Sequence, residues 1–308
     1  MCPAPLLSCA RALVVLAGLC LFAAGRAGAE AGGQPRYADQ PASAQPVLRL
    51  AVHPLHNPRK LVQAYQPLVD LLNRRVPGVR FELEASRDYA AFEAKFRHRG
   101  PELLLPNPWQ ALQAINAGYE VVAMAGEAAD FHGLFIVRRD SPLRSPADLK
   151  GQAVAYPAPT AVAACLLPQW YLAEQGLDVM REVRHRFVGS QDSAILAALH
   201  GEVAAAATWP PPWRAFQKDH PLEAAQLRVV WQTAPLVNNA VMVRSDIDGT
   251  LRARIVTVLL ALHRQAEGRA VLAGMQTGRI VPADDASYDP MRQFLVQFER
   301  RVRAVHTP

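Results

Sequence analysis

The chain has 308 residues, of which 51% are hydrophobic and 19% are charged, and its formal net charge is +6. A chain of this length and composition can bury a large core and form two lobes. Its basic residues are scattered rather than gathered in one stripe, which argues against a nucleic-acid partner, although a mildly positive field favours anionic ligands. We expect a soluble monomer.

The N-terminus has the pattern of a secretory signal. Arg11 precedes an apolar run at residues 12–24, and the small residues Ala27, Gly28 and Ala29 follow it. These features match the charged, apolar and cleavage regions of a signal peptide over residues 1–29. We therefore expect a secreted, periplasmic protein, whose charge falls to about +4 once the arginines of the signal are removed.

Two alternatives exist for this N-terminus. A retained membrane anchor is opposed by the apolar run, which is shorter than the roughly 20 residues that span a bilayer. A lipid attached at Cys20 is opposed by Leu19, since lipoproteins carry a small residue at that place. Residues 30–45 are rich in Ala, Gly, Gln and Pro and are predicted to be a disordered leader.

Only one cysteine belongs to the predicted mature chain. Cys2, Cys9 and Cys20 lie in the signal, which leaves Cys165 without a disulfide partner. A free thiol in an oxidising compartment is either buried or used for chemistry. The apolar neighbours Leu166 and Leu167 favour burial.

The first half of the chain predicts strands alternating with helices. A helix with apolar residues at helical spacing follows the first strand and has Pro67 as a kink, and Ser86 is a candidate cap for the helix that contains Tyr89. This alternation predicts a mostly parallel sheet covered by helices. The predicted strands are residues 48–52, 80–85, 103–105, 121–125 and 133–138.

A second series of the same kind starts at residues 151–168. This stretch predicts a strand at 153–155, a proline-rich turn, and a helix that begins near Thr160 to Val162, the kind of junction at which α/β proteins bind small ligands. Residues 133–137 and 239–243 resemble each other and are predicted to be the two crossing strands. The predicted lobes are 46–137 with 238–308, and 138–237. Further strands are predicted at 185–188, 203–207 and 227–231.

The order of these segments resembles the phosphate, phosphite and phosphonate-binding family of periplasmic solute-binding proteins of ABC importers. The resemblance implies the two-lobed α/β type II periplasmic-binding-protein fold. Such a protein closes over a small molecule or an oxyanion-like ligand in the cleft between the lobes and delivers it to an ABC permease. The matching segments are residues 50–54, 88–92, 139–142, 147–151, 188–193 and 199–203.

This chain departs from the family where the ligand is bound. The family places a Ser-Thr-Ser-Gly helix start before a proline, and the corresponding residues here are Ala161, Val162, Ala163 and Ala164. An oxyanion would lose several charge-assisted hydrogen bonds of about 1.5–3 kcal/mol each, for which only Thr160 offers a replacement.

Other positions at which the family binds its ligand also differ in this chain. A family aromatic falls on Ala111, with Trp109 as a nearby replacement, the family histidine is Gln191, and the family acidic residue is Thr208. Together these changes indicate a less charged or more apolar ligand, or a lost binding activity. The residues expected to contact the ligand are His53, Tyr89, Asn107, Trp109, Tyr156, Thr160, Ala161, Val162, Ser190, Gln191, Thr208 and Trp209.

Several of these residues have a second interpretation. His53 and His56 form a His-x-x-His pair that is either a metal site or part of a solvated loop, and the solvated loop is favoured. Trp109, Trp209 and Trp213 either form a wall of the site or pack in the core. Ser190 either donates to a ligand or caps a helix. We expect no metal and no cofactor.

Three functions fit these patterns. The first is a solute-binding protein that delivers its ligand to an ABC permease, and the second is a ligand sensor read by the ectodomain of a sensor kinase. The third is an enzyme on the same fold, with Cys165 as nucleophile and a histidine such as His132 as base. The apolar neighbours of Cys165 oppose an activated thiolate, so we expect no catalytic residues.

Overall fold

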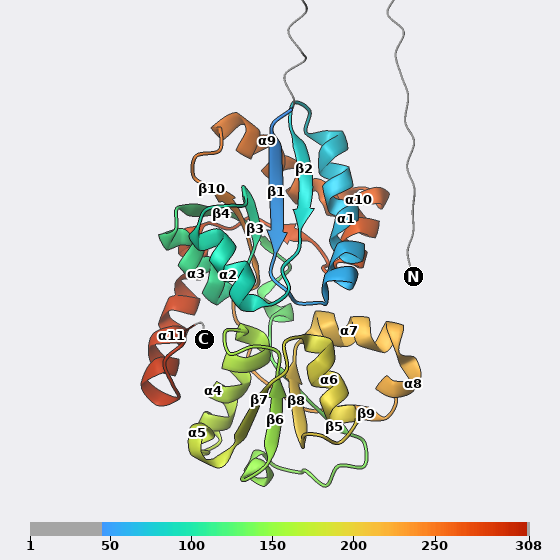
Figure 1. Ribbon diagram of the computed structural model, residues 1–308, viewed down its shortest axis with the longest axis vertical. Coiled ribbons are helices and arrows are strands. Elements are labelled where there is room, and N and C mark those ends of the chain that lie inside the picture. Colours follow the sequence, from blue (N-terminus) through green and yellow to red (C-terminus); the bar gives the residue numbers. More distant parts are fainter. Residues whose placement is uncertain (1–44, 307–308) are drawn as a thin grey trace, which may run out of the picture. The chain divides into compact units, whose positions relative to one another are not determined.

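Two β-sheets, each covered by helices, organise the residues that the structure describes (Figure 1). The structure is a computed structural model, and it describes residues 45–306. The predicted signal peptide, nearly all of the predicted leader, and Cys2, Cys9 and Cys20 lie outside these residues. Within 45–306, none of the helices combines the length and the hydropathy that a bilayer crossing requires.

The first sheet has six strands in the order β11-β4-β10-β3-β1-β2. The strands β1, β2 and β3 are parallel to one another and come from the first half of the chain, and Leu50 of β1 lies opposite Leu83 of β2 and Leu103 of β3. The strands are β1 (Val47–Val52), β2 (Arg80–Glu84), β3 (Leu103–Leu105), β4 (Tyr119–Ala125), β10 (Ala240–Arg244) and β11 (Ile280–Val281).

The first three helices of the first lobe begin at residues whose side chains cap them. Asn57 caps α1, which continues through Pro67, and Asn107 caps α3 in a reciprocal capping box with Gln110. The cap of α2 is Asp88 rather than the predicted Ser86, because the Asp88 carboxylate accepts the N–H of Ala91, three residues later. The helices are α1 (Pro58–Arg75), α2 (Tyr89–Arg97), α3 (Pro108–Asn116), α9 (Gly249–Ala261), α10 (Ala266–Gly274) and α11 (Asp289–Arg301).

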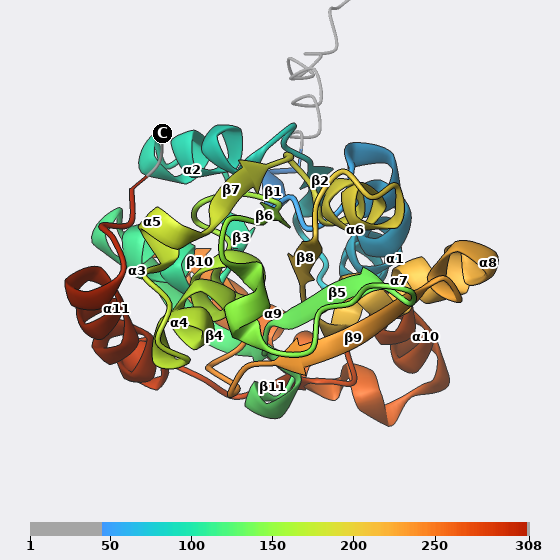
Figure 2. The ribbon, with the colours of Figure 1, turned by 90° about the horizontal axis from the view of Figure 1, so that it is seen from below.

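The second sheet has five strands in the order β7-β6-β8-β5-β9, and α4 and α6 lie on opposite sides of it (Figure 2). A short π-helix, η3 (Val162–Leu166), joins β6 to α4. The strands are β5 (Leu134–Arg138), β6 (Ala153–Tyr156), β7 (Arg184–Phe187), β8 (Ala205–Thr208) and β9 (Leu227–Gln232). The helices are α4 (Leu167–Glu174), α5 (Val179–Glu182), α6 (Gln191–Leu199), α7 (Pro210–Asp219) and α8 (Pro221–Ala224).

The predicted α/β fold with two helix-covered sheets is confirmed, but the crossing strands differ from the prediction. β5 pairs only with β8 and β9 of the second sheet, so the chain changes sheets between residues 126 and 133, before the predicted boundary at 137. It returns between residues 233 and 239. Both sheets are mixed rather than mostly parallel, because β5, β10 and β11 run opposite to their neighbours.

The first crossing segment packs tightly against the second lobe at Gly133. A Cβ atom added there would lie 2.7 Å from the carbonyl oxygen of Ala163 and 2.9 Å from the ring of Pro168. Both neighbours belong to the segment that contains η3 and the start of α4. A side chain at residue 133 would therefore displace the predicted ligand-binding helix start.

We expect Gly133→Ala to lower the free energy of unfolding by about 1–3 kcal/mol, the usual cost of overpacking. Urea unfolding followed by circular dichroism measures this change. Gly278→Ala is the matched control, because a Cβ atom there meets nothing within 4 Å. Equal stability of the Gly133 variant and the wild type would show that the loop yields to the extra methyl group.

Candidate functional site

A small cavity lies between the two sheets, where the ends of their strands face each other. Its volume is about 10 Å³, the space that one water-sized sphere occupies. A second cavity of the same volume adjoins it and shares His53, Trp209 and Asn239 with it. The first cavity is lined by His53, Tyr89, Asn107 and Asn239 from the first lobe, Phe131 from the crossing segment, and Ala161, Val162, Ala163, Ala164, Gln191 and Trp209 from the second.

Nine of the twelve predicted ligand contacts gather at this cavity. Seven line it directly, and Thr160 and Thr208 are buried behind it and hydrogen bonded to residues around it. The seven are His53, Tyr89, Asn107, Ala161, Val162, Gln191 and Trp209.

The other three predicted residues do not line the cavity and have packing or capping contacts instead. Trp109 is buried in α3 away from the cavity lining, and Tyr156 packs against the rings of His185 and Phe187. Ser190 caps α6 by accepting the N–H of Ser193. The interpretations of Trp109 as a core residue and of Ser190 as a cap are therefore the ones that the structure favours.

Phe131 and Asn239 also line the cavity, although the sequence did not single them out. Phe131 lies in the first crossing segment and contacts the ring of Trp209 edge to face at 5.3 Å. Asn239 directly precedes β10, at the end of the return crossing. Asn239 begins the second predicted crossing strand, which was the available signal for it, whereas no local pattern marks Phe131.

Thr160 links the two lobes. Its hydroxyl donates to Oε1 of Glu93 in α2 at 2.9 Å, and its carbonyl oxygen accepts from Nδ2 of Asn107 at 3.0 Å. A threonine hydroxyl has a single hydrogen. The sequence had suggested that Thr160 replaces one of the missing hydroxyl donors. That expectation is wrong, because the Thr160 hydroxyl donates its hydrogen to Glu93.

Gln191 is held between two other cavity residues. Its Oε1 accepts from the hydroxyl of Thr208 at 2.9 Å, and its side chain hydrogen bonds with Tyr89. Burial raises the pKa of Tyr89 well above its ordinary value, so the phenol stays neutral. This part of the wall is polar but uncharged.

His53 and His56 are both buried, so the expectation of a solvated loop is wrong. Nδ1 of His53 lies 3.0 Å from the carbonyl oxygen of Leu105, and it carries the ring proton because a carbonyl only accepts. Burial lowers the pKa of His53 to about 4 and that of His56 to about 3. In residues 45–306, no three His, Cys, Asp or Glu side chains gather in a metal-binding cluster.

The buried His53 predicts a specific loss of stability in acid. Between pH 6.5 and about 4 the unfolded chain binds a proton at this residue that the folded protein does not, so stability falls as the pH is lowered through this window. At pH 5 this loss is about 2 kcal/mol. His53→Gln should therefore lose about 2 kcal/mol less than the wild type between pH 7 and pH 5.

Urea unfolding at both pH values measures this difference, and the exposed His306 provides the control variant His306→Gln. The control should follow the wild type. The same acid loss in the His53 variant as in the wild type would contradict the assignment of His53 as a buried neutral ring.

Cys165 lies in η3 and is fully buried. Burial raises the pKa of its thiol to about 11, although the guanidinium of Arg303 lies 3.6 Å from Sγ. The thiol is therefore protonated at neutral pH, and a protonated thiol is a poor nucleophile. Nδ1 of His132 faces the carbonyl oxygen of Ala129.

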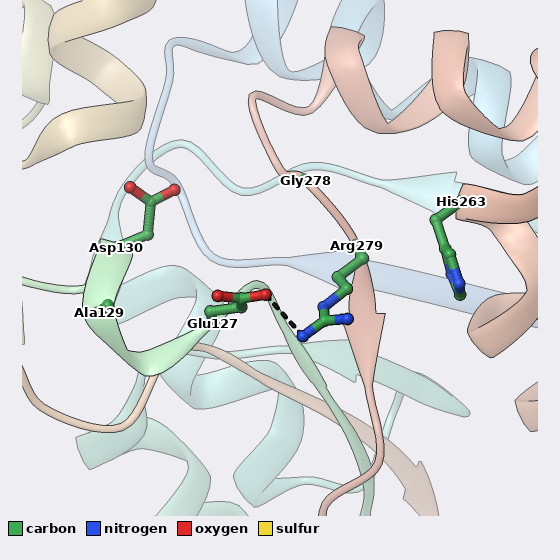
Figure 3. Close-up of a pocket in the computed structure, with 6 residues that line it drawn as sticks. All are labelled: Glu127, Ala129, Asp130, His263, Gly278 and Arg279. Atoms are coloured by element: carbon green, nitrogen blue, oxygen red, sulfur yellow. Dashed lines mark ion pairs between the residues drawn. The ribbon is translucent and has the colours of Figure 1, made fainter.

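A larger hollow lies outside this cleft (Figure 3). It has a volume of about 460 Å³, and its charged side chains include an ion pair of 2.6 Å between Glu127 and Arg279. Asp130, which also lines it, pairs with Arg214. Both side chains of the Glu127–Arg279 pair are more than half exposed, so this surface lacks the enclosed polar groups of a ligand site.

The family described as "ABC transporter, phosphonate, periplasmic substrate-binding protein" matches residues 50–288 of this chain. The match begins within β1 and ends just before α11, and it includes every residue that lines the cavity.

Three solved structures are similar in fold. A binding component of a phosphonate ABC transporter from Pseudomonas aeruginosa has a TM-score of 0.77 at 20% identity, covering 84% of this chain and 88% of its own. PhnD1 from Prochlorococcus marinus, solved with methylphosphonate, has a TM-score of 0.75 at 18% identity, covering 83% and 100%. The alkanesulfonate-binding protein SsuA from Xanthomonas axonopodis pv. citri, bound to MOPS, has a TM-score of 0.56 at 22% identity, covering 86% and 88%.

Proposed function

Because this chain belongs to the family of periplasmic substrate-binding proteins of phosphonate ABC transporters, we propose that it carries a small molecule less charged than a phosphonate. Family membership makes it the periplasmic binding component of an ABC transporter, and such components pass their ligand to a permease. The proposal concerns the ligand: its class and the way in which the lobes hold it.

One observation carries the proposal: the four residues of the helix start that line the cavity have no side-chain donors. Ala161, Val162, Ala163 and Ala164 line the cavity with methyl and isopropyl groups. The N–H groups of this helix start remain, but no lysine or arginine is among the residues that line the cavity. An oxyanion here would have few hydrogen-bond donors and no cationic side chain to replace its water.

Contacts between the lobes support capture by domain closure. Thr160 bonds to Glu93 and Asn107 of the first lobe, and Lys60 of α1 pairs with Asp219 of α7 at 2.9 Å. A ligand that touches both lobes adds to these contacts only when the lobes are together, so it favours the closed state. Nothing in the cavity favours the sensor-kinase or enzyme alternative.

The test is to identify the molecule that copurifies with the protein. The mature chain is purified from periplasm under native conditions and denatured, and the released compounds are identified by mass spectrometry. Each compound is then returned to the ligand-free protein, and small-angle scattering reports closure. We expect a neutral or weakly charged compound that lowers the radius of gyration. A phosphonate or phosphate as the closing compound would overturn the proposed ligand class.

A further inference from the structure

Glu93 is a fully buried carboxylate beside the cleft. It lies in α2 of the first lobe, and its two oxygens have different partners. Oε1 accepts from the hydroxyl of Thr160 at 2.9 Å and from Nε2 of Gln110 at 3.1 Å. Oε2 accepts from the guanidinium of Arg97 at 3.2 Å. The oxygen that faces the second lobe is therefore Oε1.

Two side chains of the first lobe, Gln110 and Arg97, hold this carboxylate. Nε2 of Gln110 donates to Glu93, while Oε1 of the same side chain accepts the N–H of Asn107 at 3.1 Å. Gln110 is thus oriented by the capping box of α3. Since Gln110 and Arg97 belong to the same lobe as Glu93, these contacts do not depend on closure, whereas the contact with Thr160 requires the lobes to be together.

The contact removes the last side-chain donor of the helix start. Between Pro157 and Pro168, Thr160 is the one residue with a hydroxyl group. That hydroxyl donates its hydrogen to Glu93, so it presents only lone pairs to a ligand. A ligand oxyanion also presents lone pairs, and the two would repel each other.

The negative charge of Glu93 also disfavours an oxyanion in the cleft. An oxyanion at the start of η3 would lie near a buried carboxylate, and like charges in a desolvated site repel strongly. The compensating guanidinium of Arg97 contacts the other oxygen and is 43% exposed to water. The residues lining the cavity supply no cation in its place.

We propose that Glu93 is the residue that excludes phosphonate and phosphate oxyanions from this cleft, by withdrawing the Thr160 hydroxyl and by placing a negative charge against the helix start. This role rests on the proposed function, since it explains how a phosphonate-type cleft comes to prefer a less charged ligand. Glu93 is therefore a specificity-determining residue that need not touch the ligand.

The test is calorimetric titration of methylphosphonate into four ligand-free proteins: wild type, Glu93→Gln, Thr160→Val and the double variant. We expect Glu93→Gln to bind at least about tenfold more tightly than the wild type. The change removes the negative charge, and with the amide oxygen accepting from Arg97, the amide N–H₂ faces Thr160, which frees its hydroxyl hydrogen for one charge-assisted bond to the ligand. Thr160→Val alone should change affinity less than about twofold, because its hydroxyl is already engaged. When Thr160→Val is added to Glu93→Gln, the double variant should lose at least about half of the binding free energy that Glu93→Gln gained.

Glu102→Gln is the matched control. Glu102 is also a buried glutamate of the first lobe that pairs with an arginine, Arg244, but it lies at the start of β3, away from the cavity. It should leave methylphosphonate affinity unchanged. Circular dichroism melting confirms that each variant is folded, and Glu93→Ala replaces Glu93→Gln if the latter does not fold.

The outcomes separate this inference from the proposed function. Submicromolar binding of methylphosphonate by the wild type would overturn the proposed ligand class itself. Weak binding by the wild type with no gain in a folded Glu93 variant would overturn the role of Glu93 and leave the ligand class standing. A gain in methylphosphonate affinity in Glu102→Gln equal to that in Glu93→Gln would show a general charge effect. That result would also overturn the role of Glu93.

Discussion

Replacing Ala161, Val162 and Ala163 by Ser, Thr and Ser is expected to raise the affinity for methylphosphonate about a thousandfold. All three side chains line the cavity at the start of a helix, so the new hydroxyls would donate toward the same small volume. Three charge-assisted hydrogen bonds of about 1.5 kcal/mol each give about 4.5 kcal/mol, which corresponds to a factor of roughly 10³. Titration calorimetry of the triple variant and the wild type measures this gain.

Ala266→Ser is the control for this experiment. It also places a hydroxyl at the start of a helix, α10, but on an exposed surface outside the cavity. It should not change the affinity. An unchanged affinity in a folded triple variant would show that the missing hydroxyls do not explain the departure from the family.

Arg303→Ala is expected to lower the free energy of unfolding by about 3 kcal/mol and to weaken closure. Arg303 follows α11 and reaches the segment that contains η3, donating to the carbonyl oxygen of Pro159 at 2.7 Å and to Oε1 of Gln169 at 3.0 Å. Two hydrogen bonds from a charged group contribute about 1.5 kcal/mol each. Since Pro159 precedes Thr160, the loss of these hydrogen bonds also loosens the segment whose Thr160 contacts the first lobe.

Urea unfolding measures the stability of this variant, and small-angle scattering measures its radius of gyration, which should rise. The exposed Arg300, also near the end of α11, provides the control variant Arg300→Ala, which should stay within about 0.5 kcal/mol of the wild type. Equal stability of the Arg300 and Arg303 variants would contradict the idea that the C-terminal segment holds the second lobe.

Most elements of the fold were predictable because their signals are local. Apolar spacing placed α1, and alternation or short apolar runs placed β1, β2 and β3 close to their observed bounds. The assignment of β5 to the first lobe was wrong because a strand's composition does not state which sheet it joins. Its partners β8 and β9 follow about 70 and 90 residues later in the chain.

The site was predictable to the extent that it follows from strand ends and helix starts. His53, Asn107, Gln191 and Trp209 all lie at such junctions, and all four line the cavity. Contacts across the lobes have no local signal, which is why Glu93 was missed: it is a helical glutamate whose partner Thr160 lies 67 residues away.

The aromatic residues were the least predictable group. Trp109 and Tyr156 are residue types that often line ligand sites, but large rings pack equally well in hydrophobic cores. Both are buried away from the cavity lining. Phe131 has no distinguishing local pattern and lies at the cavity because the first crossing segment passes there. Its role depends on the lobe arrangement rather than on the neighbouring sequence.

The central claim is that this cleft, in a chain of a phosphonate-binding family, takes a ligand less charged than a phosphonate. Titration calorimetry of methylphosphonate and of inorganic phosphate into the ligand-free wild-type protein tests it most directly. The account predicts no tight binding of either compound. A submicromolar dissociation constant for either one would contradict it.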